Sequence, residues 1–578
     1  MPAARNAAEN KPQALAPKSR LTLALGLLGS LLCYLAHPPA GLSLLAWIGP
    51  TPWLLLTRLP QLPGRRPYLK LWIAGMAFWL AAIQWIRLPY WANIFGLFLL
   101  AAYLGAYLPV FIGLTRVAVH RLNVPVWIAA PVVWTGLEWL RARLLTGFLM
   151  ASLAHTQAGN PRVIQIADLF GEYGVTFLIM LVAASIAAAL PLERISTSKD
   201  SEPGRPRPRR LTLRPLLPAT LTLAAALAYG EWRLNQEAAD AKTEASSSTG
   251  PTIALIQSDM QADWKGTPER DAAVMSQMHE LSLQAVSVSK QPVDLVVWPE
   301  TMYRDPLTMI DPANGPPAGM FDAVQLDATR RDLAAKAAEL DAAILVGVDR
   351  YVAVNDESTR DESGRRVGYR IDGYNSSALV DKSGALVGTY DKMHLLPFGE
   401  FIPLVDWLPF LRGYSPITGR AIPGTLTEPI ALGELNLSVN ICYETVLPHL
   451  IRRQFVDAIR ATGETPDVMV NLTNDAWYWG SSELDMHLAS GVFRAVEMRT
   501  PLVVAANRGL SAHVDHLGRV VQVTQRDKPA TLVANVRLNP RPGVYPSLFA
   551  RYGDWLALVS LICCMVLAAI GWRQQQRE

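Results

Sequence analysis

The chain has 578 residues, of which 51% are hydrophobic and only 18% charged, and its formal net charge is +4. Soluble chains carry about 25% charged residues. The deficit is confined to residues 21–230 and to an apolar run near the C-terminus, whereas residues 231–553 have an ordinary soluble composition. This distribution excludes a purely soluble enzyme, a disordered protein, a disulfide scaffold and a single-pass anchor. The basic residues lie in short loops between apolar runs, so we expect no nucleic-acid partner.

Eight apolar runs are long enough to cross a bilayer, which requires about 17–25 residues. They lie at residues 21–37, 41–57, 70–87, 91–115, 124–141, 172–191, 212–230 and 554–572. A shorter run at 144–157 is typical of a re-entrant or interfacial segment. We therefore predict seven spans within 21–230, an eighth at 554–572, and polar tails at 1–20 and 573–578.

Lys and Arg residues indicate which loops face the cytoplasm. They are concentrated in the N-terminal tail, in the loops after the second, fourth and sixth spans, and in the C-terminal tail. With eight spans all these segments lie on one side, and only Arg141 and Arg143 disagree. We predict cytoplasmic termini and a domain at 231–553 on the periplasmic face of a bacterial inner membrane. Glu138 and Arg141 are three residues apart and can pair on one helix face, although intramembrane charges also mark functional sites.

Residues 231–553 alternate β-rich runs with helical patterns such as 269–289 and 324–340. Strands are expected at 253–257, 294–298, 343–349, 376–380, 435–441, 468–471, 502–506 and 531–536. Many are almost entirely apolar, as expected of strands covered by helices. The predicted fold is an α/β layered domain combined with membrane α-helices.

Three polar motifs end or follow these strands: Trp298-Pro299-Glu300, Tyr390-Asp391-Lys392 and Cys442-Tyr443-Glu444. Side chains at the carboxyl ends of separate strands can converge at one edge of a sheet. A thiolate attacks acyl carbons readily when a neighbouring base removes its proton, so Glu300 can serve as the base for Cys442. Lys392 and a backbone N–H near Tyr443 can hold the oxyanion. The alternative for Cys442 is a small buried core residue.

The order Glu, Lys, Cys resembles that of the nitrilase, or carbon–nitrogen hydrolase, superfamily, which implies an αββα sandwich. Combined with the eight apolar runs, the motifs resemble those of the apolipoprotein N-acyltransferase family of Gram-negative bacteria over nearly the whole chain. The further motifs that carry this resemblance are Pro397–Glu400, Asn471–Trp477, Arg494–Glu497 and Arg551–Asp554. One motif departs from the family: Gly147-Phe148-Leu149-Met150 keeps only the first half of Gly-Phe-Pro-Trp. The expected architecture is an eight-helix transmembrane bundle carrying a periplasmic nitrilase-like sandwich.

The resemblance implies that Glu300 is the general base, Lys392 the oxyanion stabiliser and Cys442 the nucleophile. It further implies that an acyl chain moves from a phospholipid donor to Cys442 as a thioester. The chain then moves to the α-amine of the diacylglyceryl-cysteine of an apolipoprotein acceptor.

Other positions match the family outside this triad. Glu400 and Glu444 match acidic positions near it, and Trp264 and Tyr443 match aromatic positions linked to substrate handling. His394 is expected to be structural. The nine His are scattered, so we expect no metal and no other cofactor, and we expect a monomer.

An apolar loop at Phe401–Tyr414, which includes Trp407 and Phe410, directly follows Glu400. Apolar patches rich in Trp and Tyr mark membrane or ligand contact, so we expect this loop and Trp477–Trp479 to guide acyl chains. The alternative is plain core packing. The Pro/Gly-rich segment 311–319 is expected to be a mobile loop.

Two other functions use the same features. A membrane-anchored amidase would pass its acyl group to water, but it would gain nothing from eight spans. A transporter or receptor with an inactive outer domain predicts paired polar residues and broken helices in the bundle. Apart from the Glu138 group, the spans contain few such residues.

Overall fold

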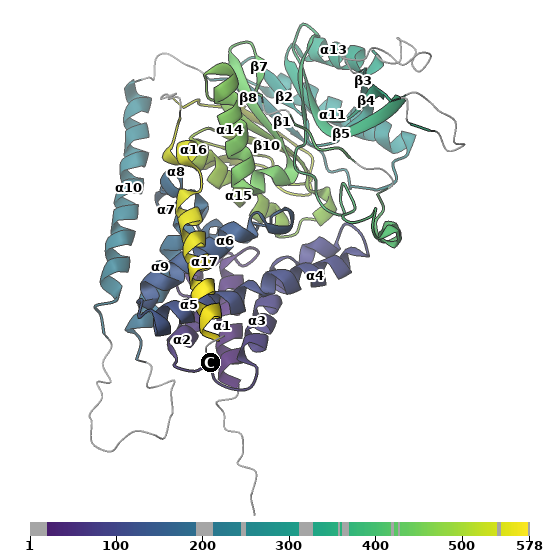
Figure 1. Ribbon diagram of the computed structural model, residues 1–578. Coiled ribbons are helices and arrows are strands. Elements are labelled where there is room, and N and C mark those ends of the chain that lie inside the picture. Colours follow the sequence, from purple (N-terminus) through teal and green to yellow (C-terminus); the bar gives the residue numbers. More distant parts are fainter. Residues whose placement is uncertain are drawn as a thin grey trace, which may run out of the picture.

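The computed structural model describes residues 20–191, 212–243, 250–310, 327–356, 359–360, 369–417, 421–425, 428–539 and 545–575. A helical domain lies on one side of the molecule and a two-sheet domain on the other (Figure 1). The predicted loop at 311–319 and most of the basic residues after the sixth predicted span lie outside the described residues.

The helical domain follows most of the predicted apolar runs. Its longer helices are α1 (Leu21–Ala36), α2 (Thr51–Arg58), α3 (Pro67–Ala82), α4 (Asn93–Gly105), α5 (Tyr107–Arg121), α6 (Val126–Arg141), α9 (Glu172–Ala189), α10 (Leu216–Thr243) and α17 (Trp555–Gln575). Among the described residues, three helical segments are long and apolar enough to cross a membrane: Asn93–Arg121, which joins α4 and α5, α9, and Trp555–Arg573. The predicted count of eight spans therefore stays a prediction.

The predicted span at 41–57 is not one helix. It consists of a 3₁₀ turn, Ser43–Trp47, and the eight-residue α2. Gly49 and Pro50 separate the two pieces, because Pro starts a helix readily but interrupts one that already runs. Helix α2 alone is about 12 Å long, well short of a bilayer.

The predicted re-entrant segment at 144–157 is irregular. It contains the 3₁₀ turns Leu144–Thr146 and Leu153–Gln157, and the short helices α7 (Pro161–Ile164) and α8 (Ala167–Phe170) follow it. Most of it is buried in protein, as irregular backbone at membrane depth must be. Just before it, Arg141 pairs with Glu138 at 3.2 Å, which confirms the predicted pairing, and Arg143 pairs with Asp554.

The last helix, α17, packs very closely on α6. A Cβ on Gly136 would lie only 2.7 Å from the backbone of Ser560 and Leu561, so no larger residue fits there without a shift of the helices. The Cys564 thiol lies 3.5 Å from the Val133 carbonyl, although 431 residues separate the two. Small residues at such crossings bring helix backbones close together. The C-terminal helix is therefore an integral part of the bundle.

The second domain contains two mixed sheets. The first has the order β13-β1-β2-β4-β5-β6, with β3 also paired to β4, and the second has the order β12-β11-β10-β9-β8-β7. Eight strands confirm the predicted ones: β1 (Thr252–Gln257), β2 (Leu295–Val297), β4 (Ala343–Asn355), β5 (Tyr369–Val380), β8 (Leu435–Ile441), β9 (Val468–Asn474), β10 (Leu502–Asn507) and β13 (Ala530–Asn535). Five were not predicted: β3 (Tyr303–Ile310), β6 (Leu386–Asp391), β7 (Ile430–Leu432), β11 (Ala512–Val514) and β12 (Val520–Val523).

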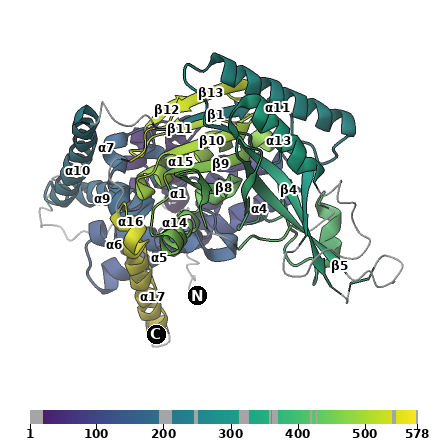
Figure 2. The same ribbon diagram turned by 90° about the horizontal axis from the view of Figure 1, so that it is seen from above.

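The sheets pack face to face through apolar side chains such as Val297 and Leu472. Helices α11 (Pro268–Val288) and α13 (Ala328–Leu340), which confirm the two predicted helical patterns, cover the first sheet. Helices α14 (Pro448–Thr462) and α15 (Glu483–Met498) cover the second sheet and share a core with the helical domain. The layers therefore follow the expected αββα order, which Figure 2 shows from above.

Buried charges join α15 to the helical domain. The Arg494 guanidinium lies 2.8 Å from Glu172, at the start of α9, and 2.9 Å from Glu497. His155 contacts the same Glu172 carboxylate at 3.0 Å. All four side chains are buried, and removing one partner of a buried pair costs about 3–5 kcal/mol. The two domains are thus held in one orientation.

Candidate active site

The first site residue, Glu300, follows β2 at the carboxyl edge of the first sheet. The preceding Trp298 is fully buried and donates a 2.8 Å hydrogen bond to Ser282 on α11. A Cβ on Gly347 of β4 would lie 2.4 Å from the Pro299 carbonyl, so only glycine leaves room for this turn. The Glu300 carboxylate is 7% exposed and accepts hydrogen bonds from Asn375 Nδ2 at 2.8 Å and from the Asn474 N–H at 3.1 Å.

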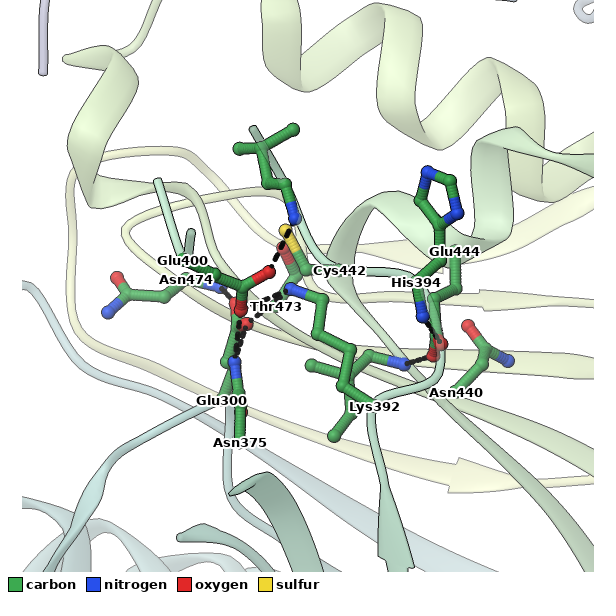
Figure 3. A network of polar contacts seen from close by, with 12 residues as sticks. Glu300, Asn375, Lys392, His394, Glu400, Asn440, Cys442, Glu444, Thr473 and Asn474 are labelled. Carbon is green, nitrogen blue, oxygen red and sulfur yellow. Dashed lines mark hydrogen bonds and ion pairs between the residues drawn. The ribbon is translucent and has the colours of Figure 1, made fainter. Parts of the chain in front are cut away.

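Lys392 follows β6 directly and is 2% exposed. Its Nζ lies 3.0 Å from Oε1 of Glu300 and 3.0 Å from Oε1 of Glu400 (Figure 3). Asn375 bridges the same two carboxylates, at 2.8 and 2.7 Å. Burial alone would lower the pKa of Lys392, but the two carboxylates raise it well above its ordinary value. Lys392 is therefore an ammonium ion with two anionic partners.

Cys442 is the first residue of a 3₁₀ turn, Cys442–Val446, directly after β8. Its φ is +52°, a left-handed conformation that is uncommon for a residue with a side chain and is often found at functional sites. Burial, and then the Glu300 charge, raise the pKa of the Cys442 thiol well above its ordinary value, while Lys392 opposes them. The group therefore rests as a thiol and needs a base to become a nucleophile.

Glu444 joins the segment that carries Lys392 to the turn that carries Cys442. One carboxylate oxygen accepts from the N–H groups of Met393 and His394, at 2.7 and 3.0 Å. The other accepts from the Tyr390 hydroxyl and the Ile441 N–H, both at 2.8 Å. Burial raises the pKa of the Glu444 carboxyl, and these donors oppose the shift. Glu444 thus fixes two loops that lie about 50 residues apart in the chain.

The aromatic residues singled out from the sequence lie at the boundary with the helical domain. The Tyr443 hydroxyl donates to the Gly147 carbonyl at 3.1 Å. Tyr443 therefore contacts the Gly-Phe part of the motif at 147–150, which is the part that matches the family. Trp264 donates to the Pro89 carbonyl at 2.9 Å, and its ring lies 4.3 Å from that of Trp477.

Trp407 and Phe410 do not contact the Glu300–Lys392–Glu400 cluster. They lie on the loop Phe401–Tyr414 and are 85% and 64% exposed, which excludes core packing for both. At the end of the same loop, the Tyr414 ring contacts the rings of Trp91 and Phe95, beside the start of α4. The loop therefore reaches the helical domain with its large apolar side chains uncovered.

Several residues of the site were not predicted as functional from the sequence. Asn375 lies within β5 and directly precedes the strand predicted at 376–380. Asp475, Glu483 and His487 are buried and place ligand atoms within 4.8 Å of one another, so in the described part of the chain they form a group that could hold a metal ion. Asp475 lies within the motif Asn471–Trp477, which was identified from the sequence. Its proximity to His487 was not predicted, because it depends on how α15 packs.

Comparisons with known proteins follow the division into two domains. Residues 29–185 match the family model of the apolipoprotein N-acyltransferase N-terminal domain, and residues 252–540 match that of carbon–nitrogen hydrolases. The chain is 30% identical to the apolipoprotein N-acyltransferase of Geobacter metallireducens over 559 residues, covering 95% of both chains. It is 29% identical to that of Rhodopirellula baltica, covering 94% of this chain and 96% of the relative.

Among solved structures, a carbon–nitrogen hydrolase from Helicobacter pylori is 16% identical and superposes with a TM-score of 0.33, covering 50% of this chain and 88% of the other. The two relatives align over nearly the whole chain, and the two family models match its two domains. Both results indicate the same family as the motifs described above. The chain is an acyltransferase and belongs to the apolipoprotein N-acyltransferase family.

Proposed function

We propose that this enzyme moves an acyl chain from a phospholipid to the α-amine of a diacylglyceryl-cysteine, with Glu300, Lys392 and Cys442 as its catalytic residues. The observation that carries the proposal is the buried cluster in which Lys392 bridges Glu300 and Glu400 beside the strained Cys442 turn. Such a cluster offers a base, a cation and a nucleophile in one place, which is the set that acyl transfer through a thioester requires.

In the first step Glu300 takes the thiol proton as Sγ attacks the ester carbonyl of the phospholipid. The carbonyl π electrons move to oxygen, and the Lys392 ammonium and the Tyr443 N–H stabilise that oxyanion. The oxyanion collapses, the C–O bond breaks, and Glu300 returns its proton to the departing lysophospholipid. Cys442 then carries the acyl chain as a thioester.

In the second step the α-amine of the lipoprotein attacks the thioester. Glu300 takes a proton from the amine, the C–S bond breaks, and the thiolate regains a proton. The result is an amide on the lipoprotein and a free enzyme. Glu400 accepts from the Lys392 ammonium, and Asn375 donates to both Glu300 and Glu400. These two residues therefore keep the base and the cation at a fixed distance through both steps.

The membrane supplies the donor in this proposal. Residues 21–230 and 554–572 form the transmembrane part of an inner-membrane protein. Residues 231–553 form the periplasmic catalytic domain, and the tails at 1–20 and 573–578 are cytoplasmic. The exposed Trp407 and Phe410 enter the outer leaflet and, with Trp264, guide acyl chains toward Cys442. Exposed aromatic side chains favour the membrane interface. The enzyme acts as a monomer and uses no metal.

Intact-protein mass spectrometry of the purified enzyme incubated with phospholipid tests the proposal. We expect a hydroxylamine-labile fatty-acyl adduct that is absent from Cys442→Ala and present in Cys563→Ala, the matched control on α17. If the folded enzyme forms no adduct in the presence of lipid, the proposed donor is wrong. If water removes the acyl group from Cys442 as fast as a lipoprotein-derived amine removes it, the result would instead support the amidase alternative.

A further inference from the structure

The main-chain carbonyl of Cys442 accepts hydrogen bonds from two side chains, one on α15 and one on β9. His487 Nε2 lies 3.0 Å from this oxygen, and Asn471 Nδ2 donates to it at 3.2 Å. His487 is 5% exposed, and on its other side Nδ1 lies 3.6 Å from the Asp475 carboxylate. This carbonyl therefore has two side-chain donors, and His487 is the closer one, since Asn471 Nδ2 also donates to Asn440 and Thr445 at 2.7 Å.

The direction of this carbonyl also determines the direction of the next N–H. A peptide group is planar and trans, so the C=O of Cys442 and the N–H of Tyr443 point in opposite directions from one rigid plane. Tyr443 is the second residue of the 3₁₀ turn, and the first N–H groups of a helix have no acceptor within it. Whatever holds the Cys442 carbonyl therefore also fixes the direction of the Tyr443 N–H, to which the proposed mechanism assigns the oxyanion.

We propose that His487, held by Asp475, is a positioning residue that aims the oxyanion-binding N–H of Tyr443 by fixing the Cys442 carbonyl. The inference rests on the proposed role of Cys442 as the acyl carrier. His487 does not touch the substrate: it acts through one peptide plane.

The surroundings of His487 hold its ring in one orientation. Nε2 faces the Cys442 carbonyl at 3.0 Å and Nδ1 faces the Asp475 carboxylate at 3.6 Å, so both ring nitrogens lie against oxygen acceptors. Asp475 is itself held by the Thr473 hydroxyl at 2.7 Å, so the donor has a fixed orientation.

A long-chain aldehyde tests the proposal. When Sγ adds to the carbonyl carbon of dodecanal, a C–S bond forms and the π electrons move to oxygen, which then takes up the thiol proton. The adduct occupies the oxyanion site. Alkylation by iodoacetamide displaces iodide at a saturated carbon and develops no oxyanion. The ratio of the two reactions therefore reports on oxyanion stabilisation by Lys392 and the Tyr443 N–H. Variants of His487 leave Lys392 in place, so a change in the ratio between them reports on the direction of the Tyr443 N–H.

We expect His487→Leu to weaken dodecanal inhibition about tenfold, part of the 10²–10³ lost when an oxyanion donor is removed, while alkylation of Cys442 keeps its rate. His487→Gln keeps a donor and should restore aldehyde affinity, and Asp475→Asn should fall between the two. His513→Leu is the matched control, since His513 is equally buried, at 4%, on β11.

If His487→Leu behaves like His513→Leu, or if aldehyde affinity and alkylation fall together, the proposal is overturned. Should His487→Leu not fold, a loss in Asp475→Asn without a loss in His487→Gln supports the proposal, and equal behaviour of those two variants overturns it. If the wild-type enzyme takes no acyl chain from phospholipid, but His487→Leu still weakens dodecanal inhibition, the proposed donor is refuted and the positioning role of His487 is supported.

Discussion

Replacement of Glu444 by Gln should weaken both the fold and the catalysis, because four donors converge on this carboxylate. The amide oxygen of Gln can serve one pair of donors, and its NH₂ group must face the other pair. The better orientation turns the NH₂ toward the Tyr390 hydroxyl and the Ile441 N–H, since the hydroxyl can rotate and accept. The Ile441 N–H and the Tyr390 O–H then both lose their acceptor, and each buried donor left without a partner costs about 1–3 kcal/mol.

The same change should slow acylation of Cys442. Glu444 sets the distance between the segment of Lys392 and the turn of Cys442, and a misplacement of about 1 Å costs roughly 10² in rate. The assay is thermal unfolding in detergent together with the rate of thioester formation from phospholipid. Glu434→Gln, at an exposed residue in the turn between β7 and β8, is the matched control. Stability within about 0.5 kcal/mol of this control, with an unchanged acylation rate, would refute the reasoning.

Three further predictions concern the charge, the loop and the domain contact. Glu300→Gln removes a charge that raises the pKa of the Cys442 thiol, so the pH profile of iodoacetamide alkylation should shift to lower pH while acyl transfer is lost; a shift to higher pH would contradict this electrostatic assignment. The double change Trp407→Ser and Phe410→Ser should impair activity on bilayer lipid more than on a soluble acyl ester, and equal losses would count against membrane contact. Arg494→Met leaves Glu172 and Glu497 buried without their cation and should cost about 3–5 kcal/mol in thermal unfolding. The control, Arg453→Met, removes an exposed side chain of α14. Equal melting temperatures of the two variants would contradict the conclusion that buried ion pairs hold the two domains together.

The strands that the sequence predicted are those buried on both faces, since a run such as Leu295–Val297 is apolar throughout. Strands β6 and β12 were missed because their residues are largely exposed or half-buried and mix polar with apolar types. The run at 41–57 was predicted as one span but forms two pieces, because a hydropathy average passes over Gly49 and Pro50, where the helical backbone is interrupted.

At the site, residues that follow a buried strand could be predicted. Glu300 and Cys442 come at or shortly after the ends of predicted strands, and the structure places both at the carboxyl edges of their sheets. The role of Glu444 as a shared acceptor could not be predicted, because three of its four donors lie on β6 and the loop after it, some fifty residues away. The contact of His487 with the Cys442 carbonyl likewise depends on the packing of α15 and leaves no local pattern.

The close fit between α6 and α17 has a consequence for biosynthesis. Val133 leaves the ribosome 431 residues before Cys564, the partner that lies against it. At about 10 residues per second, the glycine-bearing face of α6 waits roughly 40 s for its permanent neighbour. During that time the whole two-sheet domain is synthesised, and its last strand, β13, ends only 29 residues before Cys564. The face of α6 that carries Gly136 therefore lacks its neighbour for most of the synthesis of the chain, and a nascent chain released early would present that face to other helices.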